Sequence, residues 1–485
     1  MKVTRRSFLT KAALATATVS WTARSWAQVP GANGDVRVAT IGFNGRGENH
    51  ISELSKLKGV RYTALCDADL RVLEGGASRL AKEGGQVEKF QDIRKLLEYK
   101  NLDSVTIATP NHWHSLAAIW AIQAGKDVYV EKPVSHNVWE GRKVVEAARA
   151  HGKIVQTGTQ SRSNLGMREC MEYIHSGALG KVKLARGLCY KRRDSIGKVD
   201  GKQPVPVGVD LDLWCGPAPF NDEPLMRKRL HYDWHWVWAT GNGDLGNQGI
   251  HQMDLARWAL GVDHLSPRVW SLGGRFGYID DGQTPNTEIV FHEYPDAPLI
   301  FEVRGLPADP AQDKNKMDHL RGASIGVIVE CENGSVVIGS YEAGIAYDKD
   351  GKEIKRFKGG ASHFENFLKA VHSRKSSDLN ADILEGHLSS ALCHTGNISY
   401  RLGKQANRNE LLEQIKGNKN AEEAVGRMLE HLKINQVDLD KTKCSVGPVL
   451  TMDPKTERFT GKGADKANAM LKRDYRKPYV INDMV

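Results

Sequence analysis

The sequence predicts an α/β fold in which a doubly wound parallel sheet is followed by an α+β domain with an open, mostly antiparallel sheet. Three observations lead to this prediction. From Val36 to about Gly158, short β-rich runs alternate with helical patterns. From Arg268 to Gly339, strand-like runs follow one another without helices between them. The "ENGS" segment between the last two of these runs is typical of a hairpin, which pairs strands antiparallel.

Residues 1–27 are predicted to be an export signal that precedes the fold. Arg5 and Arg6 are followed by Phe8 and Leu9, and a short, weakly apolar run then ends in small residues. This run is too short to span a bilayer, so no membrane span is expected. The paired arginines resemble a twin-arginine signal. We therefore expect the twin-arginine translocation machinery as a partner and a periplasmic or otherwise exported location.

The predicted parallel sheet occupies residues 34–160. Its strand-like runs are, in order, "VRVATIG", "VRYTALCD", "SVTIATP", "DVYVEKP" and "IVQTG". Helical patterns such as "HSLAAIWAIQAG" separate them. In a doubly wound sheet, ligands bind outside the carboxyl ends of the strands, so the residues that directly follow these runs are the candidates for a site.

The loop after the first run resembles a dinucleotide-binding turn. "IGFNGRG" places Gly42, Asn44 and Gly47 at the spacing of a GxGxxG motif, with Asn44 in the middle and Gly45 beside it. Glycines let the backbone approach a pyrophosphate at a helix N-terminus, and asparagine can adopt a left-handed conformation at modest cost. Asp67 ends the second run, where its charge would accept ribose hydroxyls and repel a 2′-phosphate. This pattern predicts NAD, with NADP disfavoured; a plain strand–turn–helix is the alternative.

Lys132 follows the fourth run, within "VEKPVS". A lysine beside a positively charged nicotinamide would have a lowered pKa and could move the proton of a reacting hydroxyl. The local alternative is a surface lysine that serves only solubility.

The pattern changes after residue 160, and residues 161–415 are predicted to form the α+β domain, including helices near its end. A loop-rich stretch with many Pro and Trp residues runs from about Arg192 to Asp244. It leads into "GNGDLGNQGIHQMDLARW", a glycine-rich start followed by an amphipathic helical pattern that carries His251. Residues 416–485 are polar with two apolar patches, and we expect this extension to wrap the surface or an interface.

Taken together, the motifs resemble the Gfo/Idh/MocA family of oxidoreductases, which includes glucose-fructose oxidoreductase and inositol dehydrogenase. The glycine loop, "CDAD", "ATPNHWH", "EKPVS", "LWCGPAP" and "GNQGIHQMDLARW" occur in the family's order between Val36 and Gly261. The resemblance implies a Rossmann domain and an open-sheet domain with the active site between them. It also implies hydride transfer between a nicotinamide and a carbon that bears a sugar or polyol hydroxyl, and a homodimer or tetramer.

The resemblance assigns catalysis to Lys132 and His251. It places the following residues at the cofactor: Gly42, Asn44, Gly45, Arg46, Gly47, Asp67, Thr109, Pro110, Asn111, His114, Glu131 and Lys132. Many members of the family have Asp-x-x-x-His at the histidine, whereas this sequence has Asn247. An asparagine can bind a substrate hydroxyl but cannot titrate. Asn247 and His251 are four residues apart and are expected to share one helix face.

Three further predictions concern individual side chains. The local pattern alone favours a satisfied interior histidine at His251, and the resemblance favours the catalytic role. His235 lies in the aromatic "YDWHWVWATG" loop, which is predicted to line a sugar pocket or to form a tryptophan core. Arg162, in "QSRS", is predicted to contact substrate, with a surface position as the alternative.

Charge and cysteine content exclude other classes of function. The net charge is +10, but the basic residues are dispersed, so nucleic acid is not expected as a partner. The seven cysteines have no CxxC or CxxH spacing, so no metal site is expected. The leading hypothesis is an exported NAD-dependent oxidoreductase of a carbohydrate with tightly bound cofactor. The alternatives are an NAD-dependent enzyme that cleaves glycosides by transient oxidation and elimination, and a non-catalytic sugar-binding protein.

Overall fold

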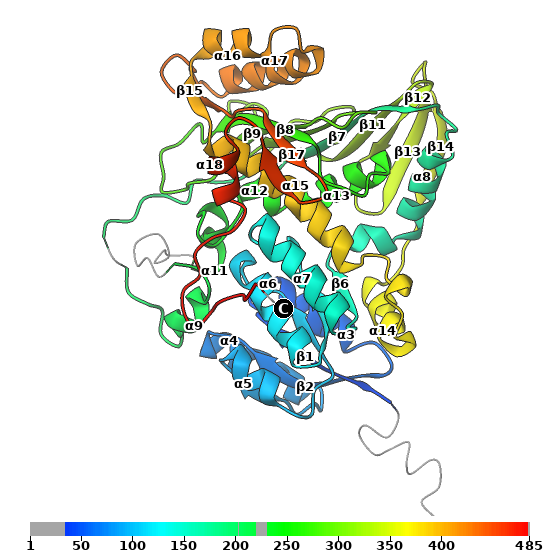
Figure 1. The fold of residues 1–485 in the computed structure, drawn as a ribbon, viewed down its shortest axis with the longest axis vertical. Coiled ribbons are helices and arrows are strands. Elements are labelled where there is room, and N and C mark those ends of the chain that lie inside the picture. Colours follow the sequence, from blue (N-terminus) through cyan, green and yellow to red (C-terminus); the bar gives the residue numbers. More distant parts are fainter. Residues whose placement is uncertain (1–33, 202, 220–229, 484–485) are drawn as a thin grey trace, which may run out of the picture.

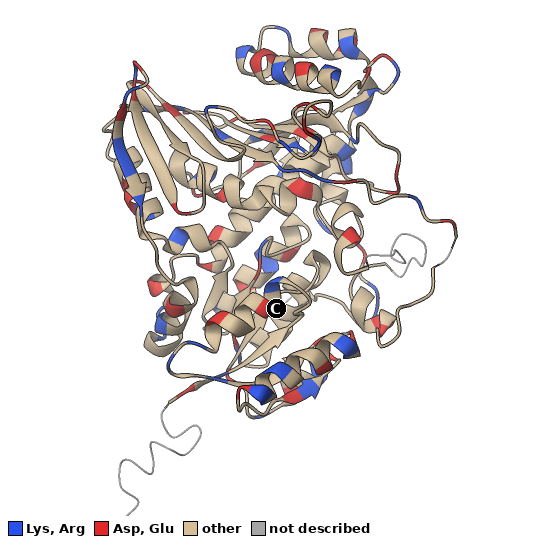
Figure 2. Ribbon diagram, turned by 180° about the vertical axis from the view of Figure 1, so that it is seen from behind, with Lys and Arg blue, Asp and Glu red and all other residues tan. Residues whose placement is uncertain are grey.

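The computed structural model describes residues 34–201, 203–219 and 230–483, which form a smaller parallel sheet and a larger mixed sheet with helices between them (Figure 1). The signal predicted at residues 1–27 lies outside these residues and stays a prediction, as does the oligomeric state. Within the described ranges, no helix has both the length and the apolar composition needed to cross a bilayer. Acidic and basic side chains are interspersed over both parts of the molecule (Figure 2).

The first part is a parallel sheet of six strands in the order β3-β2-β1-β4-β5-β6, as predicted for a doubly wound fold. Its strands are β1 (Val36–Ile41), β2 (Val60–Cys66), β3 (Glu88–Phe90), β4 (Ser104–Ile107), β5 (Asp127–Val130) and β6 (Val155–Thr157). The helices are α3 (Arg46–Leu54), α4 (Leu70–Lys82), α5 (Ile93–Glu98), α6 (Asn111–Gln123) and α7 (Val138–Ala150). Strand β3 was not predicted, because it has only three residues, of which Glu88 and Lys89 are charged and exposed and only Phe90 is apolar.

The second part is a mixed sheet in the order β14-β13-β12-β11-β7-β10-β9-β8-β16-β15, with β17 pairing with β8 and β18 with β17. Only β7 and β10 pair in parallel among these strands, so the prediction of a mostly antiparallel sheet is confirmed. The strands are β7 (Val182–Tyr190), β8 (Arg268–Gly274), β9 (Thr287–His292), β10 (Leu299–Arg304), β11 (Ile325–Cys331), β12 (Gly334–Ile338), β13 (Ala343–Asp348), β14 (Glu353–Lys358), β15 (Lys404–Ala406), β16 (Cys444–Val446), β17 (Leu450–Asp453) and β18 (Arg458–Thr460). The "ENGS" turn joins β11 to β12 in antiparallel register.

Two long helices, α13 (Gly249–Leu260) and α15 (Ile383–Arg401), lie between the mixed sheet and the parallel sheet (Figure 1). They bury Ile250, Leu255 and Leu388 against Phe301 and Val290 of the mixed sheet in one apolar cluster. The remaining helices are α8 (Leu165–His175), α9 (Leu211–Cys215), α11 (Leu230–Asp233), α12 (Gly243–Gly246), α14 (His363–Ser373), α16 (Arg408–Ile415), α17 (Lys419–Ile434) and α18 (Ala464–Ala469).

The C-terminal residues 416–483 are built into both parts of the fold rather than only covering its surface. Helix α17 buries Val425 and Met428 on the side of the mixed sheet that carries Phe291. Strand β16 then pairs with β8 and β15. The chain finally returns to the parallel sheet, where Tyr479 packs edge-on against Trp113 of α6. The last turns of the chain therefore tie the two parts together, as the red segment in Figure 1 shows.

A buried carboxylate anchors the C-terminal segment to the helices of both parts. Glu457 is 8% exposed and accepts hydrogen bonds from Arg142 of α7 and His387 of α15, with Nη2–Oε1 and Nε2–Oε1 distances of 2.6 and 2.9 Å. Burial opposes its ionisation, but the hydrogen bonds from His387 and Arg142 outweigh this effect and hold the pKa of Glu457 at about 2.

We predict that Glu457→Gln lowers the free energy of unfolding at pH 7 by on the order of 2 kcal/mol. The folded pKa lies below the ordinary value of 4.5, so the stabilisation is complete above about pH 4.5 and is lost as the pH falls toward 2. Urea unfolding should therefore show a gap between wild type and variant at pH 7 that narrows by pH 3. The control Glu53→Gln breaks an exposed ion pair with Lys56 and should change stability little. A stability difference between wild type and Glu457→Gln that does not change with pH would contradict the stabilising role of the Glu457 charge.

Candidate active site

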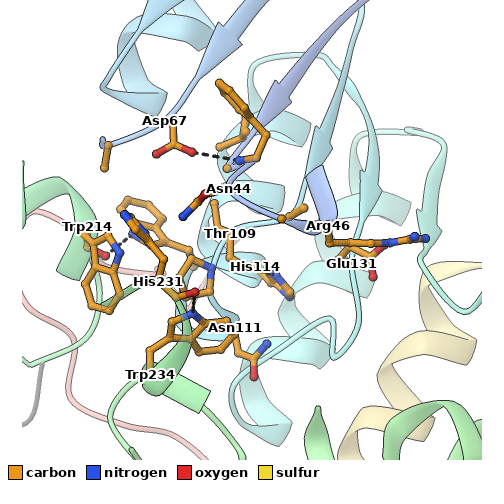
Figure 3. A pocket seen from close by; sticks show the side chains of 18 of the residues that line it. Asn44, Arg46, Asp67, Thr109, Asn111, His114, Glu131, Trp214, His231 and Trp234 are labelled. Carbon is orange, nitrogen blue, oxygen red and sulfur yellow. Dashed lines mark hydrogen bonds and ion pairs between the residues drawn. The ribbon is translucent and has the colours of Figure 1, made fainter. Parts of the chain in front are cut away.

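A cavity of about 320 Å³ lies at the carboxyl edge of the parallel sheet, facing Leu213, Trp214 and residues between 231 and 247 of the second part. Its volume is in the range of small-molecule sites. The parallel sheet contributes the glycine loop, Asp67, residues 108–114, Glu131 and Lys132, and the second part contributes Trp214, His231, Tyr232, Trp234, His235 and Asn247. Figure 3 shows these side chains converging on one space from both parts.

The glycine loop follows β1 and lies directly against the loop after β4. Gly42 has a φ of +74°, and a Cβ placed on it would lie 2.8 Å from Thr109 Cα. A Cβ on Gly47 would lie 2.2 Å from the Gly42 carbonyl oxygen, so neither position has room for a side chain. Gly45 has a φ of +133°, and a Cβ there would meet nothing within 4 Å. The expected left-handed conformation of Asn44 is wrong, because Gly42 and Gly45 supply the positive φ values.

The residues of this loop fit NAD. Gly45 is the N-cap of α3 without a side-chain cap, so the open space at Gly45 adjoins a helix N-terminus that suits a pyrophosphate. Asp67 directly follows β2, and its two carboxylate oxygens accept hydrogen bonds from the amides of Phe43 and Asp69 at 3.0 and 2.9 Å. These bonds hold the carboxylate at the cavity, where the ribose of a dinucleotide would lie.

Glu131 forms a buried cluster with two residues of α3. It is 4% exposed and accepts hydrogen bonds from Arg46 Nε at 2.8 Å and His50 Nε2 at 2.9 Å. Burial would raise its pKa, but the hydrogen bond from His50 and the charge of Arg46 hold it well below the ordinary value. A Cβ on Gly158 would lie 2.7 Å from Glu131 Oε2, so only glycine leaves room for the carboxylate. His50 was not predicted, although it lies one helical turn after Arg46 and therefore on the same face.

Lys132 bridges the two parts of the molecule. Its Nζ donates a hydrogen bond of 2.9 Å to the backbone carbonyl of Asn247. Burial lowers the pKa of Lys132, while the neighbouring charge of Glu131 raises it by less. The predicted helical pairing of Asn247 with His251 is wrong, because α12 ends at Gly246 and α13 begins at Gly249. Asn247 lies in the break between two helices, and the group that meets Lys132 is its carbonyl.

His251 lies on α13 near Lys132 but is not among the residues that line the cavity. It is 7% exposed and meets the ring of Tyr341 edge-on, with ring centroids 5.0 Å apart. Burial lowers its pKa well below the ordinary value, and the charge of Lys132 lowers it further, so the ring is neutral. Within the described part of the chain, its Nδ1 has no hydrogen-bond partner.

Sequence patterns did not predict several polar residues near Lys132, His235 and His251. Lys191, at the end of β7, donates a hydrogen bond of 2.8 Å to Gln248 Oε1, and Gln248 Nε2 hydrogen-bonds the Tyr341 hydroxyl. Asp244 forms an ion pair of 2.7 Å with Arg193. These residues come from β7, α12, the start of α13 and the segment before β13. Only the packing of the sheet on α13 brings them together, so no spacing in the sequence identifies them.

The loop after β4 positions its predicted residues at the cavity wall. Thr109, Pro110, Asn111 and His114 all line the cavity. The two ring nitrogens of His114 contact the carbonyl oxygens of Pro133 and Thr109 at 2.6 and 2.7 Å, so this side chain joins the loops after β4 and β5. Pro110 is the N-cap of α6, which begins at Asn111.

The other two predicted substrate residues have different surroundings. His235 lines the cavity and stacks on Trp234 with ring centroids 3.6 Å apart, as expected for an aromatic wall. Arg162 is neither on the surface nor among the lining residues. It is 6% exposed and forms ion pairs with Asp254 and Glu385 at 2.8 and 3.1 Å. Because these carboxylates occupy its guanidinium, the structure does not support the predicted contact with substrate.

Comparison with known families assigns two regions of the chain. Residues 36–159 match the Gfo/Idh/MocA model described as an oxidoreductase family with an NAD-binding Rossmann fold. Residues 167–275 match the C-terminal alpha/beta domain of the same oxidoreductase family. The first part of the structure is therefore an NAD-binding Rossmann domain.

Curated relatives match about a third of this chain. An inositol 2-dehydrogenase/D-chiro-inositol 3-dehydrogenase of Shouchella clausii is 31% identical over 153 residues, which are 31% of this chain and 43% of the relative. A glycosyl hydrolase family 109 protein of Shewanella sp. is 30% identical over 154 residues, which are 30% of this chain and 33% of the relative. Each match thus spans less than half of the relative's length.

Two solved structures share the fold of both parts. The WlbA dehydrogenase from Bordetella pertussis, in complex with NADH and UDP-GlcNAcA, has a TM-score of 0.54 and 17% identity over 76% of this chain and 97% of its own. Levoglucosan dehydrogenase in complex with NADH and levoglucosan has a TM-score of 0.54 and 17% identity over 74% of this chain and 95% of its own. At this identity, the likeness shows the fold alone.

We predict that Gly42→Ala weakens NAD binding at least tenfold and lowers the melting temperature. The new Cβ would lie 2.8 Å from backbone and side-chain atoms of Thr109 at a φ of +74° that alanine adopts at a cost. Isothermal titration with NAD and a thermal melt measure both effects. Gly75→Ala is the matched control, because its Cβ would meet nothing within 4 Å in the exposed part of α4. If Gly42→Ala bound NAD with the wild-type affinity, the proposed NAD site at the glycine loop would be contradicted.

Proposed function

We propose that this chain, which matches Gfo/Idh/MocA oxidoreductase models over residues 36–159 and 167–275, oxidises a hydroxyl-bearing carbon of a sugar or polyol with NAD. The observation that carries the proposal is the position of Lys132. Its partly buried amine stands at the carboxyl edge of the NAD-binding sheet, in a cavity whose opposite wall comes from the second part. Bound NAD⁺ supplies the hydride acceptor for such an oxidation.

Lys132 is the proposed proton acceptor. Burial lowers its pKa, so a larger fraction of the amine is neutral near physiological pH than for an exposed lysine. A neutral Nζ can take the proton of the reacting hydroxyl while the adjacent carbon loses its hydride. The hydrogen bond to the Asn247 carbonyl orients this amine toward the second part, where a substrate would lie.

His251 and its polar neighbours are proposed to hold the substrate. The neutral imidazole has an unpartnered Nδ1 within the described residues, which suits a hydroxyl better than a charged group. Lys191, Gln248 and Tyr341 form a hydrogen-bonded chain beside it. The aromatic rings of Trp234 and His235 offer a flat apolar surface on which a sugar ring can pack.

Asp67 is proposed to select NAD over NADP. Its carboxylate is fixed by two backbone amides, so it cannot turn away from a 2′-phosphate without losing both hydrogen bonds. A second negative charge at this position would be repelled at short range.

A second candidate is the cleavage of a glycoside through transient oxidation. The similarity of 30% of this chain to a glycosyl hydrolase family 109 protein favours this alternative. Both reactions begin with loss of a hydroxyl proton and a hydride, so Lys132 has the same role in each. They differ in the fate of the oxidised sugar, which is released in the first and loses its aglycone and is reduced again in the second.

We predict that Lys132→Met lowers kcat by about 10² to 10⁴ and leaves NAD binding within a few-fold of wild type. In the wild type, kcat/KM should rise with pH through an ionisation below 10.5, because the neutral amine is the active form and its pKa is lowered. NADH absorbance over a panel of polyols and sugars measures the rate.

Lys126→Met is the matched control for this experiment. Lys126 precedes β5, at the opposite edge of the sheet, and its Nζ donates a hydrogen bond to the Leu102 carbonyl at 2.7 Å. This control should keep the wild-type rate constant and pH profile. A Lys132→Met variant with full activity would refute the proposed proton transfer, and a wild type with no turnover that still binds sugars would support a non-catalytic binding protein.

We predict that a nitrophenyl glycoside or a disaccharide yields a keto sugar together with one NADH per product, without release of the aglycone. The reason is that net oxidation leaves the hydride on the nicotinamide, whereas cleavage returns it and consumes no net NAD⁺. Chromatography of products beside NADH absorbance distinguishes the two reactions. Aglycone release with catalytic amounts of NAD⁺ would establish glycoside cleavage instead.

A further inference from the structure

A second cavity, of about 760 Å³, lies on the other side of the segment 238–242 and shares no lining residue with the first. Its walls come from the residues before α7, from α15, and from residues 458–474 of the C-terminal segment. Helices α12, α15 and α18 surround this region in Figure 1. None of the proposed steps of hydride transfer uses these residues.

Three buried polar residues that line this second cavity each carry one side-chain atom without a hydrogen-bond partner within the described residues. The atoms are Asn397 Oδ1, Asn242 Nδ2 and His394 Nδ1, and the three residues are 4%, 5% and 3% exposed. The opposite ends of two of these side chains are held in place. Asn397 Nδ2 donates to the Asn242 carbonyl at 3.1 Å, and His394 Nε2 contacts Ser135 Oγ at 3.0 Å. Buried polar atoms without partners are costly, and rigidly held ones are typical of a binding site.

The charged residues around this cavity are mostly basic. Arg401, Arg458, Lys472 and Arg473 line it, against a single acidic residue, Asp474. Arg473 is paired with Glu140 at 3.2 Å, and Lys472 with Asp483 at 2.9 Å. No carboxylate of the described chain lies within ion-pair distance of Arg401, whose guanidinium stacks over the ring of Trp238, 5.0 Å from its centroid. Burial lowers the pKa of Arg401, and no acidic neighbour raises it.

We propose that this second cavity binds a hydroxylated organic anion, of which sugar carboxylates and sugar phosphates are the two sources. The Arg401 guanidinium, with Arg458 beside the cavity, binds the anionic group by donating charge-assisted hydrogen bonds to it. Asn242 supplies a donor and Asn397 an acceptor, which together match a hydroxyl that both donates and accepts. Trp238 provides an apolar edge for the carbon skeleton. The proposal does not depend on the reaction at the first cavity.

The test uses isothermal titration of the full chain with four probes: D-glucuronate, D-glucose 6-phosphate, inorganic phosphate and neutral methyl α-D-glucoside. We expect one of the two sugar anions to bind, with an affinity at least tenfold above that of the glucoside and of inorganic phosphate. Arg401→Gln should weaken this binding at least tenfold, and added salt should weaken it further. The preferred sugar anion identifies carboxylate or phosphate as the source.

Three variants separate this site from the first cavity and from loss of folding. Lys132→Met should bind the anion as wild type does, because it alters only the first cavity. Arg356→Gln, which removes an exposed arginine paired with Glu353 on β14, is the matched control and should also bind normally. Asn397→Leu should weaken the binding of the sugar anion but not the binding of inorganic phosphate.

Several outcomes would overturn the proposal. These are the absence of binding by either sugar anion, equal binding by Arg401→Gln, and loss of binding in Lys132→Met, which would place the anion in the first cavity. If inorganic phosphate bound as tightly as the sugar phosphate, the proposed recognition of a hydroxyl by the buried amides of Asn242 and Asn397 would be wrong. Because Arg401 is exposed at its far end, Arg401→Gln is expected to fold, and Arg458→Gln provides a second exposed variant with the same expected loss.

Discussion

The buried carboxylate of Glu131 organises the whole candidate site. It joins the end of β5 to α3 through Arg46 and His50, so the strand that carries Lys132 and the helix that begins at the glycine loop are held in one arrangement. A buried charge without these partners would cost several kcal/mol, which makes the cluster all-or-none. The same arrangement requires a glycine at position 158, because any Cβ there would displace the Glu131 carboxylate. The position of the proposed base therefore follows from a packing constraint.

Where the two parts of the molecule meet, a polar group of one part finds its hydrogen-bond partner in the other part. Lys132 finds its acceptor in a carbonyl exposed by the break between α12 and α13. The break has a second effect, since it lets α13 begin with His251 in its first turn, against Tyr341 in the segment before β13. Burial lowers the pKa values of both Lys132 and His251. Burial between the two parts is therefore the largest common cause of both lowered pKa values.

The C-terminal chain links the two cavities. Arg473 donates hydrogen bonds to the carbonyls of Ala239 and His112, which fixes the segment 238–242 against the Rossmann helix α6. One side of this segment adjoins the residues of the first cavity, and the other side forms a wall of the second. A ligand bound in the second cavity would therefore contact a segment that also supports the aromatic wall of the first cavity. This arrangement exists only because residues beyond 416 return across both domains.

The sequence by itself determined the local elements and the groups that follow them. Short β-rich runs and helical patterns predicted the parallel strands other than β3. The ends of those strands carried the glycine loop, Asp67 and Lys132, because parallel strands bring their carboxyl ends to one edge. Tertiary structure alone decided which distant groups meet. The pattern at 241–258 could not reveal the break at Asn247, and no spacing linked Arg162 to Asp254 and Glu385. The pairing of β16 with β8, and the residues around His251, also depend on contacts between segments far apart in the chain. The physical reason is that periodicity records which face of an element is buried, whereas partners across a core are chosen by packing and by the requirement that every buried charge find its counterpart.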